Sequence, residues 1–282
     1  MSSQLISIRD FLSNITQEPF SSSLYSIFFI QEESRFTIDG TSYHSQGNIV
    51  LFLSPYQVLT WQKEPSKYRL LSFHGDFYCI EYHKYEVACN GLLFNNAYLK
   101  PYVEVDDNLH AYLHQLTNHI SKEKASEEDV QPFTSSIIKS YLQLLLALCS
   151  RQKNSVEVEQ KRLIDQQASL FERLLEEYHL SERRVSFYAN RLGISPEVLS
   201  RKSKQAFGKT PTQLIQDRVI IAAKKYLHLT NKSIKEIAML LKFEDEFYFS
   251  RYFKKATGLS PKYFREEVGI SIIDHNPPPQ KE

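Results

Sequence analysis

The 282-residue chain is poor in the residues and segments on which several classes of protein depend. Its three cysteines (Cys79, Cys89 and Cys149) include no C-x-x-C pair, which argues against a disulfide framework, a zinc finger and a thioredoxin-like site. No apolar run approaches the roughly 20 residues that span a bilayer, and the N-terminus lacks the pattern of a secretory signal. We therefore expect no membrane partner and a reducing cytoplasm as the compartment.

Motifs for enzymatic chemistry are also missing. The eight glycines form neither a G-x-S-x-G elbow nor a phosphate-binding loop, and no paired-carboxylate motif is present. A DNA-repair methyltransferase would need an activated cysteine in a Pro-Cys-His setting, and the three cysteines have other neighbours. They are predicted to be small buried side chains. We therefore predict that the protein is not an enzyme and requires no cofactor.

The formal net charge of +1 conceals a strong asymmetry between the two halves of the chain. Residues 1–160 contain 12 Lys and Arg against 18 Asp and Glu, whereas residues 161–282 contain 22 against 15. The front half is therefore acidic (−6) and the back half is basic (+7). Such an asymmetry favours a polyanionic partner for the C-terminal half.

The first hundred residues predict a β-rich domain. Short runs rich in Phe, Tyr, Ile and Leu occupy residues 23–30, 35–38, 41–44, 49–53, 58–61 and 68–73. Asp39-Gly40 between two of these runs predicts a two-residue hairpin, because both positions tolerate the positive φ of a type I′ turn. Several short strands with close turns predict a small barrel or sandwich over residues 1–105.

Helical periodicity replaces the β pattern from residue 106 onward. Leu109, Leu113, Leu116 and Ile120 recur at helical spacing, and a stronger apolar pattern covers residues 137–149. This second helix is apolar around most of its circumference, so it needs cover on more than one side. We expect both packing against the β domain and a subunit interface, and hence a homodimer. The polar residues 152–160 are the best linker candidate, so residues 106–160 form the helical interface and linker.

The C-terminal half contains an internal repeat at an offset of 50 residues. The identical positions are Ser200/Ser250, Arg201/Arg251, Lys204/Lys254, Gly208/Gly258 and Pro211/Pro261. A repeat this specific indicates that one supersecondary unit is used twice.

Each copy predicts two short helices joined by a tight turn, which is a helix-turn-helix. In the first copy Gly193 ends a helical pattern, and Ser195-Pro196 begins the next helix as N-cap and first-turn proline. The second copy begins with a capping box from Ser233 to Glu236.

A connecting helix joins the two copies. It begins at the capping box formed by Thr210 and Gln213 and reaches about residue 229. Asp245 caps the second helix of the second copy. The region 161–268 is therefore predicted to contain seven or so helices that hold two helix-turn-helix units, followed by a disordered tail at 269–282.

The second helix of each unit would present a polar face to the major groove of DNA. In the first copy this face consists of Glu197, Ser200, Arg201 and Lys204. In the second copy it consists of Glu246, Phe247, Ser250, Arg251 and Lys254. Arginine can pair bidentately with guanine, lysine suits phosphate, and serine can donate to either. We predict these residues as the DNA-binding site.

The residues of this region resemble a known family. Residues 185–265 carry YANRLGISPEVLSRKSKQAFGKTP and SIKEIAMLLKFEDEFYFSRYFKKATGLSPKYFR, which are similar to the AraC/XylS-type DNA-binding domain of bacterial transcription regulators. The resemblance implies that residues 196–207 and 246–257 read bases in successive major grooves. The stretch FTIDGTSYHSQGNIVLFLSPYQ (residues 36–57) more loosely resembles the cupin-like sensor domains attached to such regulators.

Three positions depart from the family pattern. The family usually has Phe where Ser203 stands, so the first recognition helix is expected to be less firmly packed. The usual Gly before Phe243 is Lys242, which affects the geometry of the second turn. A Ser is common where Phe247 stands, and Phe could instead contact a thymine methyl group.

The N-terminal barrel could hold a small-molecule effector, since small barrels bind one ligand between apolar walls. The candidate lining residues are Tyr25, Tyr43, Phe52, Trp61 and His74. Aromatic side chains on strands are more often part of the core, so core packing is the alternative interpretation of each of these residues.

A metal-dependent cupin-type enzyme with an accessory DNA-binding domain is the alternative interpretation. Such chemistry needs two or three His and a carboxylate that converge on a metal. His44 has no His two residues away, and His74 and His83 lie on later segments, so no metal ligands are predicted. The preferred hypothesis is an α+β transcription regulator with a cupin-like sensor domain and a double helix-turn-helix domain. Its expected partners are double-stranded DNA, a second copy and, for an activator, RNA polymerase.

Overall fold

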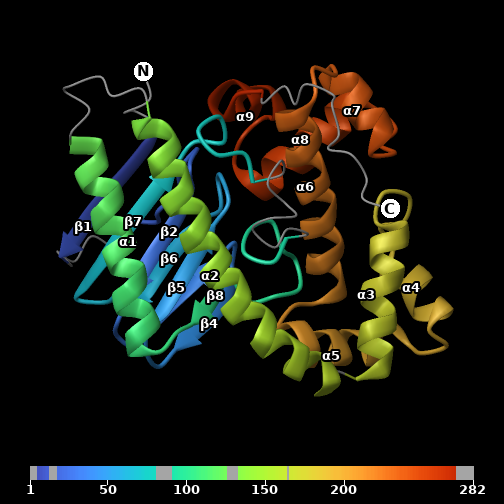
Figure 1. Ribbon diagram of the computed structural model, residues 1–282. Helices are drawn as coiled ribbons and strands as arrows, with labels where there is room; N and C mark the ends of the chain where they lie inside the picture. Colours follow the sequence, from blue (N-terminus) through green and yellow to red (C-terminus); the bar gives the residue numbers. More distant parts are fainter. Residues whose placement is uncertain (1–4, 13–17, 81–90, 126–132, 164, 271–282) are drawn as a thin grey trace, which may run out of the picture.

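The computed structural model describes residues 5–12, 18–80, 91–125, 133–163 and 165–270 (Figure 1). Within these residues eight strands come first: β1 (Ile6–Leu12), β2 (Tyr25–Ile30), β3 (Ser34–Ile38), β4 (Thr41–Ser45), β5 (Ile49–Leu53), β6 (Leu59–Lys63), β7 (Lys67–Phe73) and β8 (Tyr102–Glu104). Nine helices follow: α1 (Asp107–Ala125), α2 (Thr134–Leu163), α3 (Gln166–Tyr178), α4 (Val185–Arg191), α5 (Pro196–Phe207), α6 (Pro211–Leu229), α7 (Ile234–Leu240), α8 (Glu246–Thr257) and α9 (Pro261–Val268). This order confirms the predicted α+β class.

The strands form two antiparallel sheets. One has the order β1-β7-β2-β5-β8, and the other has the order β4-β3-β6. The hairpin between β3 and β4 turns at Asp39 (φ 48°) and Gly40 (φ 78°), as the positive φ values of a type I′ turn require. All six predicted strands are present, whereas β1 and β8 were not predicted. The cupin-like character of the domain stays a prediction.

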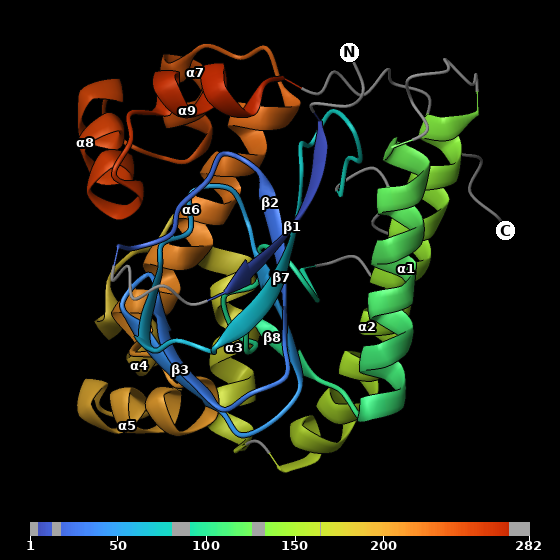
Figure 2. The same cartoon turned by 90° about the vertical axis from the view of Figure 1, so that its left-hand side faces the viewer.

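Alternate residues of the larger sheet face two different cores, because side chains alternate along a strand. On β2, Phe28 and Ile30 pack between the two sheets, whereas Ile27 and Phe29 point to the opposite face. This opposite face is covered by α1 and α2, whose buried residues include Leu113. Figure 2 shows the resulting layers, with the helix pair on one side of the sheets and α6 on the other.

Helix α2 is longer than the apolar pattern at 137–149 predicted. Its backbone is helical from Thr134 to Leu163, so the predicted linker 152–160 continues the same helix. None of the helices in the described residues is both long and apolar enough to cross a membrane.

The C-terminal half contains seven described helices, α3 to α9, as the sequence predicted. Helix α6 is the central rod, with α5 near one of its ends and α8 near the other (Figures 1 and 2). Of the predicted disordered tail, residues 271–282 lie outside the described residues.

Candidate nucleic-acid interface

The two predicted helix-turn-helix units are both formed, by α4 with α5 and by α7 with α8. Local signals set their boundaries. Ser195 caps α5 by accepting a hydrogen bond from the Val198 N–H, and Asp245 caps α8 in the same way through Tyr248. Helix α6 begins at the predicted capping box of Thr210 and Gln213. The bounds predicted for α5, α6 and α8 are confirmed because these caps are encoded locally.

The turns of the two units have the same geometry despite different residues. In the first unit Gly193 has a φ of 66°, and in the second unit Lys242 has a φ of 57°. The next residue in each copy donates its N–H to the carbonyl of a buried alanine, from Ile194 to Ala189 (3.1 Å) and from Phe243 to Ala238 (2.9 Å). The replacement of glycine by Lys242 therefore preserves the turn, at the cost of left-handed backbone in a residue with a Cβ.

Ser203 does not loosen the first recognition helix. Its side chain is fully buried, and its hydroxyl donates to the Lys209 carbonyl at 2.7 Å. The expectation that this position would weaken the packing of α5 is therefore wrong in this respect, because a hydrogen bond to the α5–α6 turn compensates for the smaller side chain.

The predicted reading faces lie on the surface of α5 and α8. On α5, Glu197, Arg201 and Lys204 are exposed and Ser200 is half-buried. On α8, Phe247, Arg251 and Lys254 are exposed, and Glu246 and Ser250 are half-buried. Residues three and four apart lie on one side of a helix. The structure therefore brings the predicted residues of each copy onto one face.

The cations of these faces are available to an anionic partner. Arg201, Lys204, Arg251 and Lys254 form no ion pair with the residues that the structure describes. By contrast, Lys202 on the side of α5 is held by Asp165 at 2.8 Å.

Glu197, in the first turn of α5, is the acidic residue among the cations of this reading face. A hydrogen bond with the Ser195 side chain lowers the pKa of Glu197. An ionised carboxylate at this position is an acceptor of the type that pairs with the amino group of cytosine.

Phe247 is an exception on this surface because it is large, apolar and 69% exposed. It follows Glu246 at the N-terminal end of α8, which is the end that approaches base edges in helix-turn-helix proteins. Exposed at this end, the ring is free to contact a partner.

The five predicted effector residues do not come together. Tyr25 and Phe52 are buried in the core under α1 and α2, where Tyr25 stacks on Phe73 at 5.3 Å. Trp61 packs against Phe36 in the core between the sheets.

The other two predicted effector residues face the C-terminal domain. The His74 side chain lies beside Asp76 and Gly269, with 3.4 Å between His74 Nδ1 and Asp76 Oδ2. Tyr43 lines a hollow, and burial raises the pKa of its phenol.

This hollow of about 480 Å³ lies between the N-terminal domain and α5. Its walls include Tyr43, Tyr98, Lys100, Tyr102, Lys153, Glu172, Lys204 and Phe207. They come from β4, β8, the preceding loop, α2, α3 and α5. Sequence reasoning missed most of them because these elements, which are far apart in the sequence, meet only in the folded chain.

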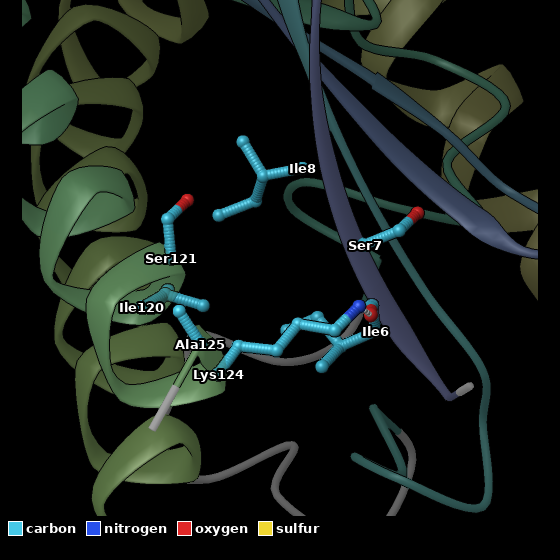
Figure 3. A pocket seen from close by; sticks show the side chains of 7 residues that line it. All are labelled: Ile6, Ser7, Ile8, Ile120, Ser121, Lys124 and Ala125. Atoms are coloured by element: carbon cyan, nitrogen blue, oxygen red, sulfur yellow. Dashed lines mark hydrogen bonds between the residues drawn. The ribbon is translucent and has the colours of Figure 1, made fainter. Parts of the chain in front are cut away.

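A second hollow of about 330 Å³ opens between β1 and α1 (Figure 3). Its walls are mainly apolar, with Ile6, Ile8 and Ile120 among them. The Lys124 side chain extends across it and donates to the Ile6 carbonyl at 2.5 Å. The residues that line this second hollow all belong to β1 and α1, and none to the C-terminal domain.

The two domains are joined by buried polar and aromatic contacts. The Lys224 ammonium donates to the Pro55 carbonyl at 2.8 Å. Lys209 bridges Asp217 at 2.7 Å and the Ala97 carbonyl at 3.1 Å. Both lysines belong to the helix-turn-helix domain, so the N-terminal domain contacts the rod and the first unit directly.

No group of three or more His, Cys, Asp or Glu side chains is placed to hold a metal ion in the part of the chain that the structure describes. Cys149 is buried, and burial raises the pKa of its thiol to about 12. Cys79 is half-buried, and Cys89 lies outside the described residues.

The fold and the site together define a protein with a double helix-turn-helix domain. Residues 188–267 match the family described as "Helix-turn-helix domain". The raffinose operon transcriptional regulatory protein RafR of Pediococcus pentosaceus is 33% identical over 79 residues, 28% of each chain. The arabinose operon regulatory protein of Escherichia coli K12 is 35% identical over 90 residues, 32% of this chain and 31% of the relative.

Among solved structures, the C-terminal domain of AraT, a response regulator from Geobacillus stearothermophilus, is 30% identical. The match covers 40% of this chain and 95% of that one, with a TM-score of 0.37. Residues 188–267 therefore form a domain of this helix-turn-helix family, and the same region is similar to the arabinose operon regulatory protein. The chain spans about a third or less of the length of the two curated relatives named above.

Proposed function

We propose that the protein is a sequence-specific DNA-binding transcription regulator in which α5 and α8 enter the major groove. The observation that carries this proposal is the repeated face of a half-buried Ser with an exposed Arg and an exposed Lys, present on both helices at the two ends of one rod. On each face, arginine near the base edges would give sequence specificity, and lysine near the phosphates would give affinity for the DNA backbone.

The test is selection of bound DNA from a random pool by the full-length protein. We expect one enriched, non-palindromic site, because the two units differ in sequence. Binding should weaken steeply with salt, since each neutralised phosphate releases counterions. A pool that remains random after selection, or an affinity that does not change with salt, would exclude this function.

The effector is proposed to bind in the hollow of about 480 Å³ between the N-terminal domain and α5. This volume suits one small molecule. Lys204 supports a regulatory role, because it lines the hollow and also belongs to the reading face of α5. An occupant would therefore contact a DNA-binding helix directly.

A Ser42→Trp substitution tests this location by filling the hollow from β4. Metabolites that change the DNA affinity of the wild type should lose their effect, while basal DNA binding is retained. Ser121→Trp, which fills the hollow between β1 and α1 from the helix side, is the matched control (Figure 3). An effector response that survives Ser42→Trp but disappears in Ser121→Trp would place the effector in the other hollow.

A homodimer through α2 is proposed from its outer face. Ile137 and Leu144 are exposed there, seven residues apart and therefore on one side of the helix. Leu144→Asp should convert the dimer to a monomer in light scattering, and Leu170→Asp on α3 should not. A monomeric wild type would exclude this arrangement.

The proposed compartment and further partner follow from binding to DNA. The protein would act in the cytoplasm, and an activator would also contact RNA polymerase. We propose no enzymatic activity and no cofactor, and the burial of Cys149 supports the absence of a reactive thiol at that position.

A further inference from the structure

Arg183 connects the two helix-turn-helix units from a position outside both of them. It lies in the segment between α3 and α4, just before the first unit begins. Its guanidinium reaches the turn between α7 and α8, which positions the second recognition helix. Nη2 donates to the Leu241 carbonyl at 2.5 Å, and Nη1 donates to the Lys242 carbonyl at 3.4 Å.

The same guanidinium also packs on an aromatic ring of the second unit. Its central carbon lies 4.0 Å from the centre of the Phe243 ring. Phe243 in turn contacts Tyr248, Phe249 and Tyr252 of α8, with ring centres 5.2 to 5.6 Å apart. The position of Arg183 is thereby linked to the orientation of α8.

The backbone next to Arg183 is fixed to the first unit. The Tyr188 hydroxyl on α4 donates to the Glu182 carbonyl at 2.8 Å. Tyr188 is fully buried in one hydrophobic cluster with Leu199 of α5. A continuous series of contacts therefore runs from α5 through Tyr188 and Arg183 to α8, in addition to the covalent link through α6.

The neighbouring Arg184 differs in every one of these respects. Its side chain is 75% exposed and pairs only locally, with Glu182 two residues away at 3.1 Å. Burying a guanidinium costs free energy unless its donors are used, so the inward position of Arg183 needs a compensating set of contacts. The two carbonyls accept from Nη1 and Nη2 and the ring of Phe243 faces the guanidinium, whereas the buried Nε has no hydrogen-bond partner among the described residues.

We propose that Arg183 is a positioning residue that fixes the orientation of the second recognition helix relative to the first, and so sets the spacing of base pairs between the two half-sites. This inference rests on the proposed function, because spacing has meaning only if both units bind DNA. Arg183 itself does not need to contact DNA for this role.

The first test measures the affinity of the full chain for duplexes that carry its selected site with one base pair inserted or deleted between the half-sites. Each such change rotates one half-site by about a tenth of a turn relative to the other. We expect the wild type and Arg184→Ala to lose about tenfold or more in affinity, as for a mismatched contact. Arg183→Ala should lose less than about threefold, and Arg183→Lys should lie between. An Arg183→Ala profile that parallels the wild-type profile would overturn the proposal.

The second test needs no DNA and separates this inference from the proposed function. Spin labels at the equivalent exposed positions Gln205 and Lys255 report the distance between α5 and α8 by pulsed electron resonance, after replacement of Cys79 and Cys89 by Ser. Arg183→Ala should broaden the distance distribution, and Arg184→Ala should leave it narrow. Equal widths in both variants would overturn the role of Arg183 even if the protein binds DNA.

Failure of the wild type to select any DNA would instead count against the proposed function alone. A melting curve for each variant distinguishes a change in orientation from unfolding of the domain. If Arg183→Ala unfolds, Arg183→Met keeps an unbranched apolar side chain and removes the guanidinium, with both its donors and its contact with Phe243, and the same two measurements apply to it.

Discussion

Lys242 is a residue whose backbone conformation is better suited to glycine. It adopts a φ of 57° in the turn where the first unit has Gly193 at 66°. Left-handed backbone costs a residue with a Cβ roughly 1–2 kcal/mol of folded-state free energy. Glycine avoids this cost, but its greater conformational freedom stabilises the unfolded chain and offsets part of the gain. Lys242→Gly should therefore stabilise the protein by about 0.5–1 kcal/mol in urea unfolding.

The control for this prediction is Lys242→Ala, which removes the charged side chain and keeps the Cβ. It should give no comparable gain. If both variants are equally stabilised, the cause is the lysine side chain and not the left-handed backbone.

Arg251 and Lys254 have different expected roles on the same helix. Arg251 lies nearer the N-terminal, base-facing end of α8, and Lys254 lies almost one turn further on. Arg251→Ala should relax base preference at one or two positions and cost about 1–3 kcal/mol of binding free energy. Lys254→Ala should weaken binding to all sequences similarly and reduce the salt dependence. Affinities for a set of single-base variants of the site measure both effects, and uniform losses in both mutants would assign Arg251 to phosphate.

Residue types alone predicted the reading faces, because both copies repeat them at fixed spacing. They could not predict the role of Arg183, since its hydrogen bond with Leu241 joins residues 58 positions apart. Nor could they show that Ser203 is buried and hydrogen-bonded to the Lys209 carbonyl. Such contacts depend on how elements pack, and no local pattern encodes them.

Helix α1 carries two histidines against the larger sheet. His110 is buried, and His114 Nδ1 lies 3.3 Å from Nη1 of Arg69, which is also paired with Asp10. Burial lowers the pKa of both histidines. The unfolded chain therefore binds more protons than the folded one once the pH falls below the ordinary histidine value of about 6.5.

Stability from these groups is thus present above about pH 6.5 and is lost as the pH falls through the lowered values. The free energy of unfolding in urea should be smaller at pH 5.5 than at pH 7.5. His110→Phe, which retains a buried ring without a titratable group, should show a smaller difference between the two conditions. A difference as large as that of the wild type would exclude His110 as its source.

At the scale of whole elements, the sequence predicted an element well where the residues that define its ends lie within the element itself. Helices α5, α6 and α8 have their predicted bounds because caps and first-turn prolines lie within the elements. Strand β8 has only three residues and depends on pairing with β5, so it gives little periodic signal of its own. The second half of α2 is polar and was predicted as a linker, although its backbone is helical.

At the scale of the whole molecule, the N-terminal domain contacts both ends of the helix-turn-helix domain. Tyr98 packs on Phe207 at the end of α5, with ring centres 5.6 Å apart, and Tyr56 packs on Phe264 of α9 at the same distance. Both contacts are made by loops of the N-terminal domain that sequence patterns do not place. An effector in the adjacent hollow, as proposed above, would change the surroundings of the first unit.

The spacing of the two units along DNA gives the last prediction. Helix α6 has 19 residues, so at about 1.5 Å per residue it is about 28 Å long. With its flanking turns it brings the recognition helices to a separation near one turn of B-DNA, about 34 Å. One monomer should thus occupy two consecutive major-groove segments on one face of the duplex, over about 17–20 base pairs. Hydroxyl-radical footprinting of a fragment of residues 161–282 should show two protected patches about 10 base pairs apart. One patch would mean that only one unit enters the groove. Ser203 holds the first unit by a hydrogen bond, whereas the turn of the second unit contains the left-handed Lys242. The second unit would then be the one to examine first.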